Sequence, residues 1–194
     1  MRNLFLLGLL SLIACQQEST SQVEKIDFNL PQFTRVVINN MDNRRADVIK
    51  SFTLNGQSEE IVFQATDSLF WSKELEWLKR TDLMAPKYQG VLSVSEGAKD
   101  NNSNLLVNRF SATDQDIDLR DLEVFYLDEI SQVRLIRLKF GTSNFIADSE
   151  GQITVWLNKY GDQLLIDSLI ASGKDKVLFQ DERNYETRLR RIRQ

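Results

Sequence analysis

The chain has 194 residues, of which 42% are hydrophobic and 27% charged, and this composition is typical of a folded domain. Its 24 Lys and Arg against 28 Asp and Glu give a formal net charge of −4, which argues against a general nucleic-acid-binding protein. The chain has no histidine and one cysteine. These counts exclude Ser-His-Asp and Cys-His catalysis, and they exclude zinc held by histidine or by several cysteines.

The first residues have the layout of a secretory signal. Arg2 precedes an apolar run at residues 4–10, which is too short to span a bilayer, since a spanning helix needs about 20 apolar residues. Leu12-Ile13-Ala14-Cys15 follows and resembles the lipobox of bacterial lipoproteins. The resemblance implies a signal peptide at residues 1–14 and a lipid on Cys15. The alternative is a secreted protein with a free cysteine near its start.

The residues after Cys15 are polar and have no hydrophobic period, so residues 15–26 are expected to be the lipidated cysteine and a flexible tether. Lipoproteins with Asp after the cysteine typically stay in the inner membrane. This chain has Gln16, so the resemblance implies the outer membrane of a Gram-negative bacterium. Because Glu18 is the only acidic residue directly after the cysteine, we expect the domain, residues 27–194, to face the periplasm.

Helical spacing of apolar residues begins at Leu30 and continues through Phe33, Val37 and Met41, with Asn29 placed as the N-cap. Two short runs, at residues 48–54 and 58–63, flank Asn55-Gly56 and predict a β-hairpin in which Leu54 faces Gln57 and Ile49 faces Val62. A second helix is predicted over residues 67–80. In it Trp71, Leu75 and Leu78 form one stripe for the core, beside Phe70 and Trp77.

From residue 88 onward, short β-like runs alternate with turn residues. Gly141, Gly151 and Gly173 are expected to lie in breaks between strands. Short loops favour antiparallel neighbours, so the fold class is α+β: two N-terminal helices and an early hairpin packed on an antiparallel meander, with a curled half-barrel as a possible form. The expected strands are residues 90–95, 105–111, 122–127, 133–140, 145–148, 153–158, 164–170, 176–179 and 185–192.

Asp114, Asp116 and Asp118 alternate like the first ligands of an EF-hand calcium loop. The pattern then fails, because Leu119 stands where the loop needs glycine and Phe125 where it needs a bidentate Glu. A solvated loop edge is expected, with a loose calcium site as the alternative. No other metal site and no cofactor is predicted.

Two further features of the sequence have surface interpretations. The basic residues near the end of the chain are expected on a solvated edge strand, with contact to anionic lipid as the alternative. Two Asp-Ser-Leu tripeptides resemble the acceptor pattern for protein O-glycosylation in one bacterial group. The basic residues are Arg183, Arg188, Arg190, Arg191 and Arg193. The Asp-Ser-Leu tripeptides lie at residues 67–69 and 167–169.

The order of elements resembles a family of uncharacterised outer-membrane lipoproteins of Bacteroidetes-type bacteria. The resemblance covers nearly the whole mature chain and implies no activity and no binding residue. In layout alone, the chain is also similar to the half-barrel lipid-handling proteins of the lipoprotein-sorting pathway. The family resemblance is carried by the lipobox ending at Cys15, Phe28, Leu30, Phe33, Asn55-Gly56, Trp71-Ser72-Lys73-Glu74-Leu75, Lys176-Val177-Leu178-Phe179 and Tyr185.

Three functions remain open from the sequence. The leading hypothesis is a lipid-anchored, non-enzymatic envelope protein with a structural or protein-binding role, whose partners are the membrane, through Cys15, and an envelope protein. The first alternative is a carrier of a hydrophobic ligand, which requires an apolar cavity beneath the helix of Trp71. The second is a carboxylate-based hydrolase, which requires acidic side chains that converge in a cleft.

Overall fold

The computed structural model describes residues 28–192. The predicted signal peptide, Cys15 and the tether lie outside the described residues, as does Arg193. In chain order the elements are α1 (Leu30–Arg44), β1 (Val48–Leu54), β2 (Gln57–Phe63), α2 (Ser68–Glu74), α3 (Glu76–Arg80), the 3-10 helix η1 (Pro86–Tyr88), β3 (Leu92–Lys99), β4 (Leu106–Ala112), β5 (Leu119–Tyr126), the 3-10 helix η2 (Ile130–Gln132), β6 (Val133–Ser143), β7 (Ala147–Tyr160), β8 (Gln163–Val177) and β9 (Arg183–Arg191).

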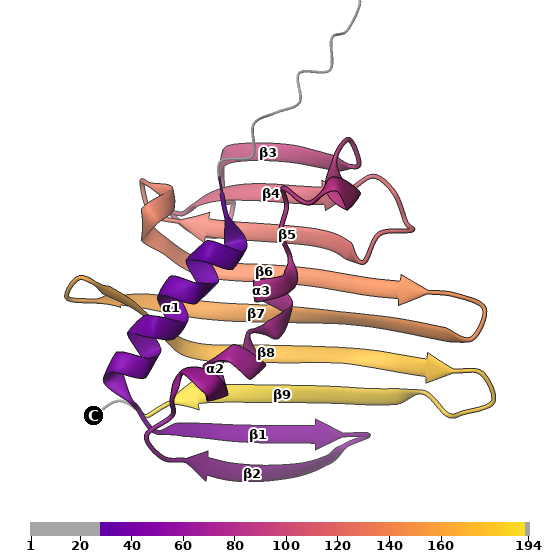
Figure 1. The fold of residues 1–194 in the computed structure, drawn as a ribbon, viewed down its shortest axis with the longest axis horizontal. Coiled ribbons are helices and arrows are strands. Elements are labelled where there is room, and N and C mark those ends of the chain that lie inside the picture. Colours follow the sequence, from indigo (N-terminus) through magenta and orange to yellow (C-terminus); the bar gives the residue numbers. More distant parts are fainter. Residues whose placement is uncertain (1–27, 193–194) are drawn as a thin grey trace, which may run out of the picture.

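Residues 28–192 form one open antiparallel sheet of nine strands, in the order β2-β1-β9-β8-β7-β6-β5-β4-β3. The strands β3 to β9 follow one another as a meander, and the N-terminal hairpin β1–β2 joins the sheet beside β9 (Figure 1). The helices α1, α2 and α3 cross one face of the sheet (Figure 1). The α+β class with an antiparallel sheet is therefore confirmed.

The first helix begins where the sequence predicts. The side-chain oxygen of Asn29 accepts a hydrogen bond from the backbone N–H of Gln32 at 2.9 Å, which is the N-cap arrangement. Leu30, Val37 and Met41 are buried against the sheet, and the Asn40 amide donates to the carbonyl of Leu164 in β8 at 3.1 Å. This contact fixes where α1 crosses the strands.

The prediction of one continuous helix over residues 67–80 is wrong, because the segment forms two helices. Leu75, with φ −103° and ψ 17°, separates α2 from α3. Trp71, Leu75 and Leu78 are nevertheless at most 2% exposed, as their spacing predicted. After the break, Trp77 of α3 stacks on Phe140 of β6, with ring centroids 4.0 Å apart.

The glycines expected in breaks lie inside long strands. β6 continues through Gly141, β7 through Gly151 and β8 through Gly173. At Gly151 and Gly173 the reason is steric, because rings from neighbouring strands occupy the space above them. A Cβ on Gly151 would lie 2.5 Å from Cζ of Phe140, and a Cβ on Gly173 would lie 2.5 Å from the Tyr185 hydroxyl oxygen.

The hairpin register is confirmed: Leu54 pairs with Gln57 and Ile49 with Val62. Strand β6 contains a register change, and this change moves Leu135 away from the core. Tyr126 pairs with Val133 and Phe125 with Leu135, so an extra residue, Arg134, lies between the two pairs on β6. Leu135 therefore faces away from the side that buries Ile136, Leu138 and Phe140.

Candidate functional site

The two faces of the sheet can be assigned from contacts with the helices. Phe140 stacks on Trp77 of α3, and Lys50 forms an ion pair with Glu74 of α2 at 2.6 Å. Residues paired directly across strands share a face, and neighbours along a strand alternate. The set that contains Phe140 and Lys50 therefore defines the covered face. No helix within residues 28–192 crosses the opposite face, which we name the uncovered face.

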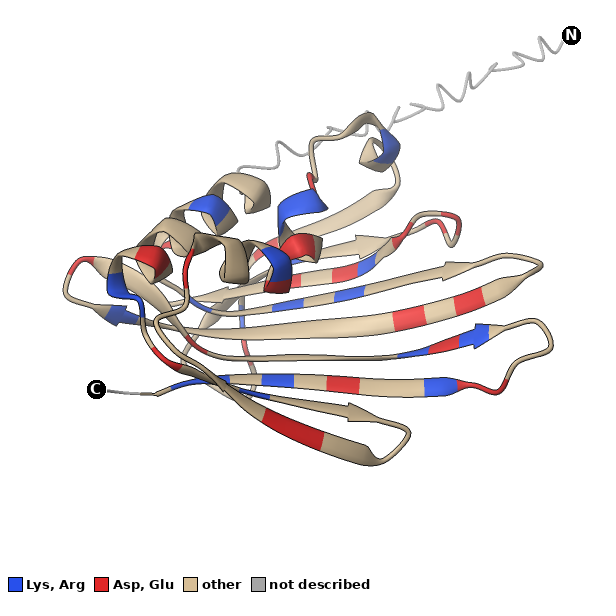
Figure 2. Cartoon of the chain, turned by 60° about the horizontal axis from the view of Figure 1, so that its bottom comes forward, with Lys and Arg blue, Asp and Glu red and all other residues tan. Residues whose placement is uncertain are grey.

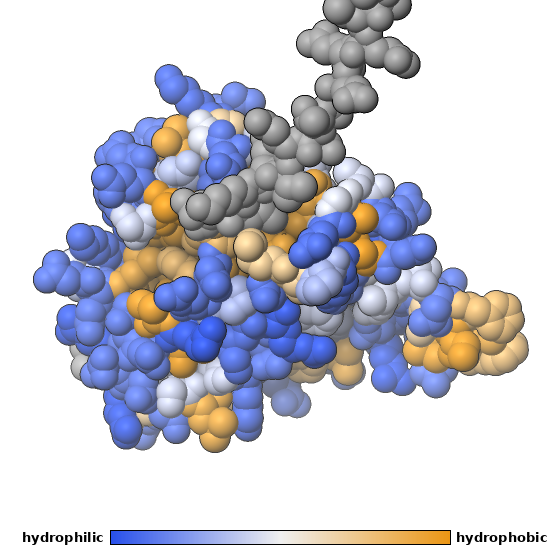
Figure 3. All heavy atoms as spheres, turned by 45° about the horizontal axis from the view of Figure 1, so that its top comes forward, coloured by the Kyte–Doolittle hydropathy of each residue, from blue (hydrophilic) through white to orange (hydrophobic). Residues whose placement is uncertain are grey.

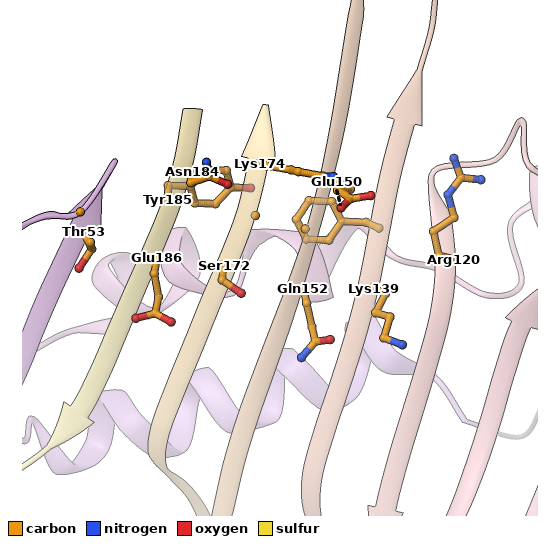
Figure 4. A pocket seen from close by; sticks show the side chains of 14 residues that line it. Thr53, Arg120, Lys139, Glu150, Gln152, Ser172, Lys174, Asn184, Tyr185 and Glu186 are labelled. Atoms are coloured by element: carbon orange, nitrogen blue, oxygen red, sulfur yellow. Dashed lines mark ion pairs between the residues drawn. The ribbon is translucent and has the colours of Figure 1, made fainter. Parts of the chain in front are cut away.

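A row of polar side chains crosses the uncovered face. Lys139 pairs with Gln152, Gln152 with Ser172, Ser172 with Glu186, and Glu186 with Thr53. Figure 4 shows these five side chains pointing the same way from five neighbouring strands. The pairing of β1 with β9 completes the row, because it brings the start of the domain beside its end.

This row borders a pocket of about 710 Å³ over β1 and β5 to β9. A volume of this size lies in the range of ligand sites, which is roughly 300–1,000 Å³. Unlike most such sites, the pocket is lined mainly by residues with polar or charged side chains. Its lining residues are Thr53, Gly56, Arg120, Lys139, Phe140, Glu150, Gly151, Gln152, Ser172, Gly173, Lys174, Asn184, Tyr185 and Glu186.

Glycines form part of the pocket floor, and aromatic rings close the sheet behind it. Gly151 pairs with both Phe140 and Gly173, and Gly173 pairs with Tyr185. The two rings lie over the glycines on the covered face. Burial and the nearby charge of Asp175 raise the pKa of Tyr185, so its hydroxyl keeps its proton at neutral pH.

Charges of both signs surround the pocket. Lys174 Nζ lies 3.0 Å from Glu150 Oε1, and this hydrogen bond and ion pair raise the pKa of Lys174 (Figure 4). Glu186 Oε1 accepts from Arg188 Nε at 2.6 Å. Each carboxylate is therefore held by a cation, and the carboxylates do not form the converging acidic pair of a hydrolase. Basic and acidic residues also alternate along the strands (Figure 2).

Beside the pocket, the uncovered face carries an ion-paired ladder and then an apolar row. Glu123 lies between two arginines, accepting from Arg109 Nε at 2.9 Å and from Arg137 Nη1 at 2.6 Å. In the next row Leu135 pairs with Trp156, whose side chain is 37% exposed. The uncovered face thus combines charged, amide and aromatic groups.

The calcium hypothesis finds no support in the geometry. Asp118 accepts hydrogen bonds from Lys87 Nζ at 2.9 Å and from the Tyr88 hydroxyl at 2.9 Å. Burial raises the pKa of Asp118, but these two partners outweigh burial and lower it overall. Asp114 accepts from the backbone N–H of Asp116 at 2.8 Å, which is a turn contact. Residues 28–192 contain no group of three acidic or cysteine side chains that would hold a metal ion.

The C-terminal arginines do not lie on an edge strand, so that expectation is wrong. β9 lies between β1 and β8, and the edges of the sheet are β2 and β3. Arg191 Nη2 donates to Asp167 at 2.9 Å, and the Arg191 guanidinium lies over the Tyr160 ring at 4.4 Å. Arg188 is paired with Glu186. These two arginines are thus engaged within the sheet.

The Asp-Ser-Leu tripeptides contribute to the fold. Asp67 is the N-cap of α2 and accepts from the backbone N–H of Phe70 at 2.9 Å. Asp167 is only 13% exposed and accepts from Arg191, Asn158 and Tyr160. Burial raises the pKa of Asp167, but these three hydrogen bonds outweigh burial and lower it to about 2.

The space beneath α2 and α3 is filled. Trp71, Leu75 and Leu78 pack into the same core as the apolar side chains of the strands. The polar pocket lies on the other side of the sheet, whereas a carrier of a hydrophobic ligand requires an apolar cavity here. No helix of residues 28–192 is long and apolar enough to cross a bilayer.

The sequence pointed to none of the pocket side chains as a site. They are ordinary strand residues, such as Ser172 and Gln152, and only the register brings them together. Comparison of the chain with protein-family models, curated proteins and solved structures gave no match. Function is therefore inferred from the geometry of the molecule.

Proposed function

We propose that this chain is a lipid-anchored protein of the outer membrane, held through Cys15, whose α+β domain binds a segment of another envelope protein in the pocket of the uncovered face. The observation that carries the binding role is the polar pocket of about 710 Å³ on a sheet face without helices among the described residues. The anchor is supported by Leu12-Ile13-Ala14-Cys15 after a short apolar run.

The lining favours an extended peptide segment with side chains of both signs. The amides of Gln152 and Asn184 offer donors and acceptors that match peptide groups. Lys139 and Arg120 suit acidic side chains, and Glu186, which already accepts from Arg188, can share its carboxylate with a basic one. A hydrophobic ligand would leave these groups desolvated without partners, which costs free energy. The lining therefore favours a protein partner over a lipid ligand.

The anchor is tested with Cys15→Ser in the native host. Two or more acyl chains hold a protein on a membrane durably, so the variant should lose incorporated fatty acid and leave the membrane fraction. Cys15 is the only cysteine of the chain, so no second thiol can replace it. A variant that is processed and membrane-bound as before would overturn the anchor.

The pocket is tested by site-specific photo-crosslinking in intact cells. A crosslinker at Ser172, within the row, should capture a discrete protein, whereas the same group at Asn39, exposed on α1, should not. The yield of the crosslinked product from Ser172, the Ser172 product, should fall severalfold with Lys139→Glu and with Lys174→Glu. Lys73→Glu, at an exposed position of α2, supplies the matched charge reversal and should leave the Ser172 product unchanged. Equal products from Ser172 and Asn39 would overturn the assignment.

A further inference from the structure

Two hairpin turns lie side by side at the end of the sheet away from the helices. One turn joins β6 to β7 at residues 144–146, and the other joins β8 to β9 at residues 178–182. The backbone N–H of Leu178 donates to the carbonyl of Ile146 at 2.8 Å, so the turns are bonded to each other. In Figure 1 both turns lie at the right-hand end of the strands.

Large apolar side chains cover these turns. Phe179 is 96% exposed and Phe145 is 90% exposed, and Ile146 and Leu178 are 63% and 45% exposed. We name these four residues the tip patch. Figure 3 shows an orange, apolar projection at this end of the molecule. Single exposed apolar residues are common on proteins, but four on two turns that are bonded to each other indicate an interaction surface.

The turns that present the tip patch are ordered by hydrogen bonds. The side-chain oxygen of Asn144 accepts from the backbone N–H groups of Ile146 and Ala147, both at 2.9 Å. The backbone N–H of Gln180 donates to the carbonyl of Val177 at 2.9 Å. The exposed side chains are therefore held on a defined backbone.

Phe179 occupies a strained backbone position. Its φ is +64°, in the left-handed region that glycine adopts without a steric penalty and a bulky side chain adopts at a cost. The ring gains almost nothing in return from this chain, because it is 96% exposed. An aromatic side chain in a turn that favours glycine, with no packing to hold it, indicates a contact outside the chain.

We propose that the tip patch inserts into the surface of a zwitterionic bilayer, the membrane to which Cys15 anchors the chain. This inference rests on the proposed anchor. The 12 residues between Cys15 and Phe28 span at most about 40 Å when extended, so an anchored domain stays near the lipid surface. At such proximity a weak second attachment suffices, because acyl chains and inserted side chains add their binding free energies.

The charged residues near the tip patch indicate which kind of bilayer surface suits it. Asp148, Asp181 and Glu182 lie near it in the chain together with Lys176 and Arg183, so basic residues are not in excess. Anionic lipid attracts clusters of basic residues, which this end lacks. Two aromatic rings on a projection instead suit the interface of a neutral bilayer, where apolar burial supplies the free energy.

The test measures insertion at single positions. Protein purified with its anchor carries Phe179→Cys or Phe145→Cys, and the new thiol is labelled with an environment-sensitive fluorophore. The labelled protein is added to vesicles of phosphatidylethanolamine and phosphatidylcholine that carry a quencher on their acyl chains. Leu69→Cys is the control, because Leu69 is an apolar residue on α2 that is 62% exposed. The fluorescence emission of labels at positions 179 and 145 should shift to shorter wavelength, and these labels should be quenched severalfold more than the label at position 69.

A second set of variants separates specific insertion from general stickiness. Phe145→Ser with Ile146→Ser should reduce quenching at position 179 severalfold. Val36→Ser with Met84→Ser removes apolar side chains that are 53% and 56% exposed elsewhere, and it should leave quenching unchanged. An equal loss in both double variants would overturn the assignment to the tip patch.

The remaining outcomes distinguish the two proposals. Protein that fails to float with the vesicles overturns both the anchor and the insertion. Protein that floats while the label at 179 behaves like the label at 69 overturns the insertion alone. A label at 179 that is already shielded before vesicles are added indicates a second copy or another protein on the patch and also overturns it. Quenching that requires added phosphatidylglycerol assigns the contact to charge and overturns apolar insertion.

Discussion

The two faces of strand β6 show how one segment supplies both stability and a surface for binding. Ile136 and Leu138 point to the covered face and are at most 1% exposed, whereas Arg137 and Lys139 point to the uncovered face. Helices bury the first pair, and cross-strand partners arrange the second. Burial of apolar area provides most of the folding free energy, so changes on the two faces should have very different costs.

The largest effect is expected from Trp71→Ala on the covered side. Trp71 is fully buried, and its indole N–H donates to Thr66 at 3.2 Å. Its loss should lower the free energy of unfolding by about 3–5 kcal/mol in urea titrations followed by circular dichroism. Trp156→Ala, at a residue 37% exposed on the uncovered face, should cost clearly less, about 1–2 kcal/mol. Equal costs would contradict the assignment of faces.

The next effect depends on pH and concerns Asp167. Its pKa falls from an ordinary 3.8 to about 2, which corresponds to at most about 2 kcal/mol of stability, because solvent screens part of the interaction. Because the folded-state pKa is lowered, this contribution is fully present above about pH 4 and is lost as the pH falls through about 2. Asp167→Asn should therefore lower stability at neutral pH, and the difference from the unmodified chain should shrink below pH 4. Asp162→Asn, in the exposed β7–β8 turn, should show no such convergence.

The tip patch belongs to neither face, and Phe179→Gly isolates its backbone strain. Glycine removes the penalty at φ +64°, so the free energy of unfolding should rise by up to about 1 kcal/mol. Phe179→Ala keeps a Cβ and should bring no gain. A rise in the midpoint of thermal unfolding for glycine alone is the expected result, and a loss of stability in both variants would indicate that the ring packs on the domain.

The smallest effect is expected from Glu123→Gln, which breaks the paired ladder on the uncovered face. The side chains of Arg109 and Arg137 are 46% and 36% exposed, so solvent screens both pairs, and the cost should be under about 1 kcal/mol and should decrease as salt is added. The neighbouring Leu122→Ala removes a fully buried side chain and should cost about 2–5 kcal/mol at any salt concentration. Urea titrations at low and high salt measure both.

Features governed by neighbours in the chain were predictable. The Asn29 cap, the Asn55-Gly56 hairpin with its register and the burial of Trp71 all depend on residues a few positions apart. The breaks expected at Gly151 and Gly173 were not found, because rings from adjacent strands occupy the space a side chain would fill. No local pattern distinguishes that use of glycine from a turn.

The candidate site was beyond the reach of local patterns for the same reason. Thr53 and Glu186 are directly paired although they come from opposite ends of the domain, and the pocket extends between them and Lys139. The basic cluster was assigned to an edge strand because nothing near Arg188 in the chain reveals that β1 pairs with β9. The tip patch likewise depends on two turns that meet in space.

The sequence by itself determined the antiparallel α+β class, the hairpin, the Asn29 cap and the residues that form the core stripe, because hydrophobic periodicity and capping depend on residues only a few positions apart. It also carries the lipobox prediction at Cys15, which lies outside the described residues. The tertiary structure alone decided the order of the strands, the position of the pocket on the uncovered face and the contact between the two turns that carry the tip patch. These arise from strand register between distant segments, where the free energy of packing rather than local preference selects the partner.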